Sequence, residues 1–431
     1  MAAAPFAPVA TAELELERRL ELRSPLGRRL GDYARARVLV RLHGRPLGLL
    51  EVELDRARDA DALAAHAWRT LRGEIAEHLH SDGLPPAQSL TADGLHAREP
   101  PGCRRRRAQL LADAPYASVV VATRERPGDL QRCLDSLLRL DYPSFEIIVV
   151  DNAPRTDATV RLVADVPRSS RHVRYVREPR AGLAAAHNRG LSAARGEVVA
   201  FTDDDVVADR EWLSELVASF RADRHVACVT GLIAAAELDT REQLWQEEYW
   251  GFDKGFVRRV IELDSDPSPL HPYATGRFGS GANMAFRTAV LRELGGFDPA
   301  LGAGGPALGG DDLAAFFEIV AAGRRLVYEP AAIVYHRHRR DYTALRAQAY
   351  GYGVGLTAYL TRLLVERPQR LGPFVGRLPD GLAHALGAGS AKNARKRAEY
   401  PRELTWLERA GMAYGPFAYM RGRWERRALY R

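Results

Sequence analysis

Residues 116–152 read YASVVVATRERPGDLQRCLDSLLRLDYPSFEIIVVDN, and this stretch decides the fold class. Ser118–Ala122 is a short apolar run typical of a buried parallel strand, and Glu146–Val150 is a second run of the same kind. Between them, apolar residues recur at the spacing of an amphipathic helix: Leu130, Cys133, Leu134, Leu137 and Leu138. Two apolar strands around one helix predict a βαβ unit in a parallel sheet.

The alternation of strands and helices continues beyond this unit. We predict further strands and helices at Val173–Val176, Leu183–Ala194, Val198–Phe201, Leu213–Phe220 and Val226–Thr230. After Gly231 the pattern lapses into an aromatic-rich segment (237–272) and a glycine-rich loop (302–310), before a helix after Asp311 and short strands at Arg325–Tyr328 and Ile333–Tyr335. The sequence therefore predicts an α/β domain over residues 113–340, a mostly parallel sheet with flanking helices.

The two flanks have a different texture. Residues 1–112 predict a small α+β accessory region, with a hairpin in Arg37–Leu54 and a helix over Ala60–His80. The arginine run Arg104–Arg107 is interpreted as a linker, with contact to an anionic surface as the alternative. Residues 341–431 predict a helical, basic C-terminal region.

Composition limits the classes of function. The net charge is +7, yet only three of the 62 basic residues are lysines, which indicates codon bias rather than a phosphate-binding surface, and we expect no nucleic-acid partner. The three cysteines are far apart, with neither zinc-type spacing nor a disulfide framework, which favours a cytoplasmic setting. We expect neither a secretory signal nor a transmembrane helix.

The basic C-terminus leaves two interpretations open. Two segments, Arg395–Arg397 and Tyr419–Arg431, are basic, and Arg421, Arg423, Arg426 and Arg427 stand beside Phe417, Tyr419 and Trp424. Such a helix either packs with a solvated arginine face or docks on anionic lipid at the inner face of the membrane.

Three consecutive aspartates, Asp203-Asp204-Asp205, follow the predicted buried strand Val198–Phe201. Adjacent carboxylates repel one another, and a hard divalent cation such as Mn²⁺ or Mg²⁺ removes that conflict while leaving room for substrate phosphates. Asp203 and Asp205 face one pocket if the segment is extended, and Asp204 then points elsewhere, toward sugar or ribose. A solvated acidic turn or a helix cap is the alternative.

Two further groups carry candidate chemistry. Asp311 and Asp312 open a helix directly after the glycine-rich loop, where a carboxylate either caps the helix or acts as a general base. His336 follows a predicted strand and is a candidate metal ligand, although no zinc motif accompanies it. The chain has no GxSxG elbow, no Walker motif and no GxGxxG after the first strand, which argues against hydrolase, P-loop and dehydrogenase functions.

Six segments in order resemble the inverting family 2 glycosyltransferases with a GT-A fold, over about Tyr116 to Tyr342. They are residues 118–138, EIIVVDNAP (146–154), residues 178–205 ending in TDDD, GSGANMAFR (279–287), GGFD (295–298) with residues 309–330, and VYHRH (334–338). The resemblance implies that the nucleoside of the donor is held by Thr123, Arg126 and Asp151, with Arg180, Asn188, Gly190 and Asp204 nearby. It further implies metal ligation by Asp203 and Asp205, with His336 as a less uniform ligand.

The resemblance also implies a reaction. Asp312 corresponds to the catalytic base of the family, and Asp311 stands where glutamate is usual. We therefore expect metal-dependent, inverting transfer of a sugar from a nucleotide-diphospho-sugar, UDP-linked by default, to a hydroxyl of a saccharide, lipid-linked or small-molecule acceptor. A non-catalytic nucleotide-sugar-binding scaffold and a nucleotidyltransferase are the alternatives.

Overall fold

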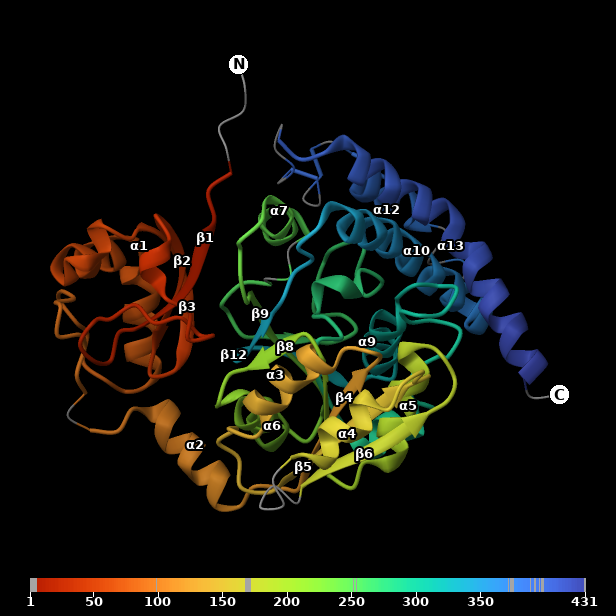
Figure 1. Ribbon diagram of the computed structural model, residues 1–431, viewed down its shortest axis with the longest axis horizontal. Coiled ribbons are helices and arrows are strands. Elements are labelled where there is room, and N and C mark those ends of the chain that lie inside the picture. Colours follow the sequence, from red (N-terminus) through yellow and green to blue (C-terminus); the bar gives the residue numbers. More distant parts are fainter. Residues whose placement is uncertain are drawn as a thin grey trace.

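A computed structural model of the chain describes residues 6–97, 99–166, 172–250, 252, 254–370, 372, 376–387, 389–390, 393–394, 396 and 399–429. A large central sheet with helices on both faces forms the middle of the molecule (Figure 1). A smaller three-stranded sheet lies to one side of it, and two long helices run together along the other side.

The central sheet is mixed rather than uniformly parallel. Its strand order is β10-β12-β9-β11-β7-β4-β5-β6, with β8 (Val206–Ala208) paired to β12. The strands read from residues 116–203 pair in parallel, as predicted: β4 (Ala117–Thr123), β5 (Phe145–Asn152), β6 (Val173–Glu178) and β7 (Val198–Asp203). β11 (Asn283–Arg287), which the periodicity did not reveal, runs antiparallel between β7 and β9 (Val226–Ala235).

Strand β12 (Arg325–His336) differs from the prediction in one respect. The two short strands expected there form one long strand, with an irregularity in its pairing to β9 between Glu329 and Ile333. It pairs with β10 (Arg259–Ile261) at its start and ends at the candidate ligand His336.

Alternation along the strands divides the core into two layers. Val119 and Val121 of β4 pack against one face, with α3 (Pro127–Leu137) and α6 (Trp212–Ala222). Val120 packs on the opposite face, with α5 (Leu183–Ala193), α8 (Thr288–Glu293) and α9 (Asp311–Ala321). Burial on both faces explains why these strands read as continuous apolar runs.

The N-terminal region contains β1 (Val9–Glu15), β2 (Arg35–Leu42), β3 (Arg45–Glu53) and α1 (Ala60–Ser81). The hairpin and helix agree with the prediction, whereas β1, parallel to β2, was not foreseen. The arginine run expected as a linker lies instead within α2 (Gly102–Ala112). Arg104 pairs with Glu17, and Arg107 pairs with Glu211 and with Glu215 on α6, the latter at 2.6 Å.

The N-terminal region is docked on the central sheet by polar and apolar contacts. The Thr11 hydroxyl donates to the Ala236 carbonyl at 2.9 Å, and Leu39 packs in a cluster with Ile333. Arg41, whose side chain is 9% exposed, contacts Asp209 at 2.7 Å, and Arg45 contacts Glu329 of β12 at 2.7 Å. The region therefore rests directly on the strand that leads to His336.

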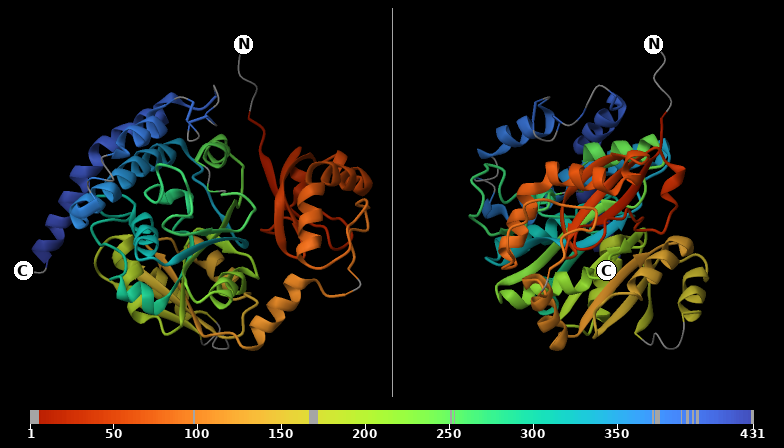
Figure 2. Two further views of the ribbon diagram at one scale, coloured as in Figure 1. Left: turned by 180° about the vertical axis from the view of Figure 1, so that it is seen from behind. Right: turned by 90° about the vertical axis from the view of Figure 1, so that its left-hand side faces the viewer.

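The C-terminal region is helical, with α10 (Tyr342–Glu366), α12 (Leu378–Leu386) and α13 (Arg402–Leu429). Helices α10 and α13 run side by side in Figure 1 and in the left view of Figure 2, and glycines set their separation. A Cβ added at Gly353 would lie 1.9 Å from the Glu408 carbonyl oxygen, and one at Gly411 would lie 2.2 Å from that of Tyr350. Among the described helices, none has the length and apolar character needed to cross a membrane.

Candidate functional site

The predicted polar residues gather at the carboxyl ends of neighbouring strands. Thr123 ends β4, Asp151 lies at the end of β5, Asp203 ends β7 and His336 ends β12. Ligand sites in open α/β sheets form at this edge, because the loops that leave parallel strands meet there. Strand β4, which carries Thr123, pairs directly with the strands of Asp151 and Asp203.

Asp203, Asp205 and His336 form a compact set of donor atoms. One atom from each lies within 4.8 Å of the others. His336 Nε2 lies 3.3 Å from Asp205 Oδ1. Burial and the neighbouring Asp205 raise the pKa of Asp203 to about 6. Burial acts in the same direction on Asp205, but His336, Arg339 and Arg126 outweigh it and lower the pKa of Asp205. Two carboxylates and an imidazole in this arrangement fit a divalent cation.

A chain of hydrogen bonds orients His336. Its Nδ1 lies 3.1 Å from His338 Nδ1, and His338 Nε2 lies 2.8 Å from Glu247 Oε2 on α7 (Arg241–Trp250). The chain is satisfied when His338 donates to Glu247 and His336 donates to His338. In this tautomer the lone pair of His336 Nε2 is directed at the aspartates. Hydrogen-bond partners of metal-binding histidines commonly fix the imidazole ring in this way.

Asp204 points away from that set. Its Oδ2 accepts a hydrogen bond from the Thr123 hydroxyl at 2.7 Å, and its Oδ1 accepts one from Arg126 at 3.1 Å. Arg126 also contacts Asp205 at 3.1 Å. Burial, followed by the charge of Asp205, raises the pKa of Asp204 to about 6. Thr123 and Arg126 thus fix the loop through Asp204, and Arg126 is the part of this group that is exposed, with 39% of its side chain accessible.

Asp151 is buried and incompletely paired. Its Oδ2 accepts a hydrogen bond from the Tyr175 hydroxyl at 3.0 Å, whereas its Oδ1 has no hydrogen-bond partner among the described residues. Burial raises the pKa of this carboxyl. The next residue, Asn152, holds the following loop: its amide donates to the Arg180 carbonyl at 2.7 Å and accepts from the Gly182 amide at 3.0 Å. The Arg180 side chain pairs with Glu178 at 2.9 Å.

Asn188 and Gly190 lie on α5 and make packing contacts. The Asn188 amide donates to the Phe297 carbonyl at 2.7 Å and accepts from the Phe297 amide at 2.8 Å. A Cβ at Gly190 would lie 2.3 Å from Val120 Cγ1, so glycine allows the helix to approach β4. Because both polar atoms of Asn188 are already bonded, the geometry here supports a bracing role; donor contact by these two residues stays a prediction.

The second acidic pair forms a separate group at the start of α9. Asp312 Oδ2 accepts from the Gly281 amide at 2.8 Å, and its Oδ1 accepts from the Leu313 amide at 2.8 Å. Burial, followed by the charge of Asp311, raises the pKa of Asp312 to about 6. Asp311 is buried and lies 3.2 Å from His187 Nδ1. A carboxyl that titrates near 6 while half-buried has the properties of a general base at neutral pH.

The glycine-rich loop (302–310) lies against α5, and the aromatic-rich segment (237–272) contacts α10. In the glycine-rich loop the Gly302 amide donates to the Gly309 carbonyl at 3.0 Å, and Ala303 accepts from Leu183 at 2.8 Å, so the loop is folded against α5. The aromatic segment places Trp250 against Tyr352 of α10, with ring centroids 5.0 Å apart. Tyr352 is 39% exposed and lies within electrostatic range of Asp312 and Asp203.

Sequence reasoning missed several residues of this edge. They are Asn152, Tyr175, His187, Glu247, Arg339 and Tyr352. Arg339 stands three residues after His336, so the basic cluster 336–340 was a usable signal. Glu247 and Tyr352 reach the site from helices outside the strand pattern, and their positions required the fold.

Comparison with known proteins bears on this site. Residues 118–295 match the family model described as glycosyl transferase family 2. The chain is 29% identical over 335 residues to the pre-mycofactocin glycosyltransferase of Mycobacterium tuberculosis, covering 72% of this chain and 64% of that protein. It is 26% identical over 187 residues to the glucosyl-dolichyl phosphate glucuronosyltransferase of Haloferax volcanii, covering 42% of this chain and 55% of that protein.

Among solved structures, the mannosyltransferase PcManGT from Pyrobaculum calidifontis, in complex with GDP-Man and Mn²⁺, is similar with a TM-score of 0.44 and 22% identity. That similarity covers 72% of this chain and 88% of the other. The chain spans about two thirds or less of the length of the curated relatives named above. The matched residues 118–295 contain β4 to β7, the aspartate triplet and Gly281, so the similarity to glycosyl transferase family 2 covers the part of the chain that carries Asp203 and Asp205.

Proposed function

We propose that this protein is a metal-dependent, inverting glycosyltransferase that moves a sugar from a nucleotide-diphospho-sugar to an acceptor hydroxyl. One observation carries the proposal: two separate acidic groups lie at the same edge of the sheet. Asp203 and Asp205 join His336, whereas Asp312 is held apart by the Gly281 amide, and His187 acts electrostatically on both groups. Inverting transfer requires a base and a leaving-group site on opposite sides of one sugar.

Asp203, Asp205 and His336 would hold the cation. When bound, a divalent cation neutralises negative charge on the departing nucleoside diphosphate. Carboxylates suit both Mg²⁺ and Mn²⁺, and the imidazole favours Mn²⁺, since Mg²⁺ is commonly bound by oxygen ligands alone. Arg126 and Arg339 contact Asp205 and supply additional positive charge beside the diphosphate.

Asp312 would accept the proton of the acceptor hydroxyl. The amides of Gly281 and Leu313 fix the carboxylate plane, so the base is positioned before the acceptor arrives. The neighbouring Asp311 raises the proton affinity of Asp312. His187, which contacts Asp311, acts in the opposite direction and lowers the proton affinity of Asp312.

The donor is proposed to be UDP-linked, with its base against Asp151. The unpaired Oδ1 of Asp151 is an acceptor suited to an N–H group of a nucleobase, and Tyr175 fixes the other oxygen. Exposed Arg126 is available to ribose or phosphate. The acceptor class stays broad, as a saccharide, lipid-linked or small molecule, since the relatives are named for different acceptors.

Helix α13 is proposed to rest on anionic lipid at the inner face of the cytoplasmic membrane. Its exposed side chains include Trp406, Phe417, Met420 and Trp424, and the last three follow a helical i, i+3, i+7 spacing. Two details of the sequence prediction change: Tyr419 is buried rather than part of this face, and Arg423 is paired with Glu366 at 2.8 Å. Arg395, Arg397, Tyr430 and Arg431, and the side chain of Arg427, lie outside what the structure describes.

A donor screen tests the enzymatic proposal. The purified chain is incubated with UDP-, GDP- and dTDP-sugars, with Mn²⁺ or Mg²⁺ and with a chelator, and release of nucleoside diphosphate is measured. We expect release from one donor that the chelator abolishes and Mn²⁺ restores. Donor binding without any release would identify a scaffold, and pyrophosphate release from a nucleoside triphosphate and a sugar phosphate would identify a nucleotidyltransferase; either result overturns the proposal.

A further inference from the structure

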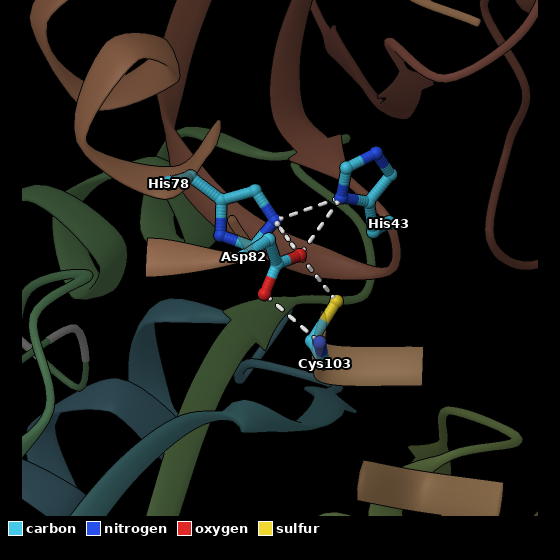
Figure 3. A group of neighbouring side chains, drawn as sticks. All are labelled: His43, His78, Asp82 and Cys103. Atoms are coloured by element: carbon cyan, nitrogen blue, oxygen red, sulfur yellow. Dashed lines mark hydrogen bonds and ion pairs between the residues drawn. The ribbon is translucent and has the colours of Figure 1, made fainter. Parts of the chain in front are cut away.

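Four side chains with metal-binding atoms converge in the N-terminal region, far from the aspartate triplet in sequence. They are His43, His78, Asp82 and Cys103, and one ligand atom of each lies within 4.8 Å of the others (Figure 3). Their spacing in sequence follows no zinc motif, which is why the cysteine count did not reveal them. The fold brings them together from three separate elements.

Each element presents its residue for a local reason. His43 and Gly44 form the turn between β2 and β3, with φ of 56° and 86°, as a two-residue type I′ hairpin requires. His78 and Asp82 are four residues apart at the end of α1, so they lie on one face of the helix. Cys103 lies in the first turn of α2.

The distances are slightly shorter than those of a tetrahedral site that holds its ion. His43 Nδ1 lies 3.1 Å from His78 Nε2 and 3.1 Å from Asp82 Oδ2, and His78 Nε2 lies 3.3 Å from the same oxygen. Cys103 Sγ lies 2.8 Å from Asp82 Oδ2. Metal–ligand bonds of about 2.0–2.3 Å place the ligands of tetrahedral zinc about 3.3–3.8 Å apart. An outward shift of a few tenths of an ångström to about one ångström would therefore admit the ion.

We propose that His43, His78, Asp82 and Cys103 form a structural Zn²⁺ site. The side chains of His43 and Asp82 are fully buried, and that of His78 is 7% exposed, so the four ligands close the site as in structural zinc centres. A thiolate and a carboxylate balance the charge of a dication when both imidazoles are neutral. The mixture of sulfur and nitrogen donors selects Zn²⁺ over Mg²⁺ or Ca²⁺.

Outer contacts support the ligand geometry. The ligand atoms of His43, His78 and Cys103 contact Asp82 Oδ2. The other oxygen, Asp82 Oδ1, accepts hydrogen bonds from the backbone amide of Cys103 at 2.9 Å and from Arg106 at 3.4 Å. These bonds fix the carboxylate so that Oδ2 is directed at the cluster. A zinc ion would tie the hairpin turn, the end of α1 and the start of α2 into one unit.

A nucleophilic Cys–His–Asp site is the alternative use of these residues. In such a site the carboxylate orients the imidazole and the imidazole contacts the thiol. Here the carboxylate oxygen contacts the thiol directly. Burial and the Asp82 contact also raise the pKa of the Cys103 thiol to about 12, which disfavours a reactive thiolate, whereas a bound zinc ion displaces that proton.

The position of the site explains what the ion would stabilise. Gly44, next to His43, lies close to the central region, since a Cβ added there would lie 2.4 Å from Glu211 Oε2. On α2, Arg107 forms ion pairs with Glu211 and Glu215. Zinc would therefore hold the hairpin turn and α2 in the arrangement that docks the N-terminal region on α6. The proposal is independent of sugar transfer.

Metal content of the full-length chain tests the proposal. The protein is produced with zinc, dialysed against metal-free buffer, and assayed by elemental analysis. It is then exchanged with Co²⁺ and examined for a sulfur-to-cobalt charge-transfer absorption. We expect one zinc equivalent per chain and a thiolate band in the cobalt form. Less than one tenth of an equivalent, or a cobalt spectrum without a thiolate band, would overturn the proposal without any variant.

Three variants locate the ion. Cys103→Ala should lose the zinc and the thiolate band, whereas Cys228→Ala, at another buried cysteine, should retain both. The double variant Asp203→Asn, Asp205→Asn should also retain them, which separates this ion from any cation at the sheet edge. Full zinc retention by Cys103→Ala, or loss in the Asp203, Asp205 variant alone, would contradict the assignment.

Discussion

Replacing Asp312 by asparagine separates sugar transfer from donor binding. The carboxylate accepts two hydrogen bonds, from the Gly281 and Leu313 amides, both at 2.8 Å. Asparagine has one acceptor oxygen, so its NH₂ group must face one of these N–H donors. A buried donor left without an acceptor costs about 1–3 kcal/mol in the free energy of unfolding.

The effect on transfer is expected to be larger. Loss of a positioned general base lowers the rate about 10²–10⁴-fold, or roughly 3–5 kcal/mol of transition-state stabilisation. Donor affinity should stay within about threefold of wild type, a change of less than about 1 kcal/mol, because Asp151 and the aspartate triplet are untouched. Transfer is measured by nucleoside diphosphate release with acceptor, donor affinity by calorimetry, and stability by urea unfolding.

The pH dependence provides the control. Asp312 acts when ionised, and its pKa is raised to about 6, so transfer should be nearly constant above pH 7 and fall with pH below 6. At pH 5 it should be about one tenth of the plateau, since one pH unit below the pKa leaves about a tenth of the carboxyl ionised. Asp312→Asn transferring at more than half the wild-type rate would refute the assignment of the base.

Three further predictions follow from contacts outside the reacting atoms. Glu247→Gln weakens the acceptor at the end of the His336–His338 chain, and Mn²⁺ affinity measured by calorimetry should fall about 10–100-fold; unchanged affinity would remove this chain from metal binding. Gly353→Ala places a Cβ 1.9 Å from a backbone oxygen of α13 and should cost about 1–3 kcal/mol or more in thermal unfolding. Its control Gly73→Ala, in open space on α1, should be neutral or stabilising, and equal stability of the two variants would contradict the packing argument. Trp424→Glu, at a side chain that is 71% exposed, should reduce sedimentation with anionic vesicles several-fold, and wild-type binding by this variant would argue against lipid contact through α13.

The predictable part of the fold is the part whose signal is local. The apolar runs that became β4, β5 and β7 are buried on both faces, so a short window of sequence identified each of them. Strand β11 was missed because it is only five residues long and its Asn283 is a buried polar residue, bonded to Trp212 and to the carbonyls of Leu232 and Ala332. A strand of that composition is recognised only when its partners are known.

The candidate site likewise has residues that could be predicted from the sequence and residues that could not. Asp203, Asp205 and His336 were predicted as a group, and the structure brings their donor atoms together. The linker assignment of Arg104–Arg107 was wrong because tertiary ion pairs, which no local pattern encodes, hold this run as a helix against α6. The His43–Cys103 cluster was missed for a related reason: its residues are up to 60 positions apart, and only the packing of α1 and α2 on the hairpin unites them.

Through its contacts with strand β12, the N-terminal region supports the part of the sheet that ends at His336. Glu329, midway along β12, is 4% exposed and pairs with Arg45, and seven residues later the strand ends at His336. A chain shortened to begin at residue 113 would leave the buried Glu329 carboxylate without Arg45. It would also expose Ile333 and Tyr335, which favours aggregation. Residues 6–112 therefore support the edge of the sheet that carries the candidate site, and a fragment intended to keep that site should retain them.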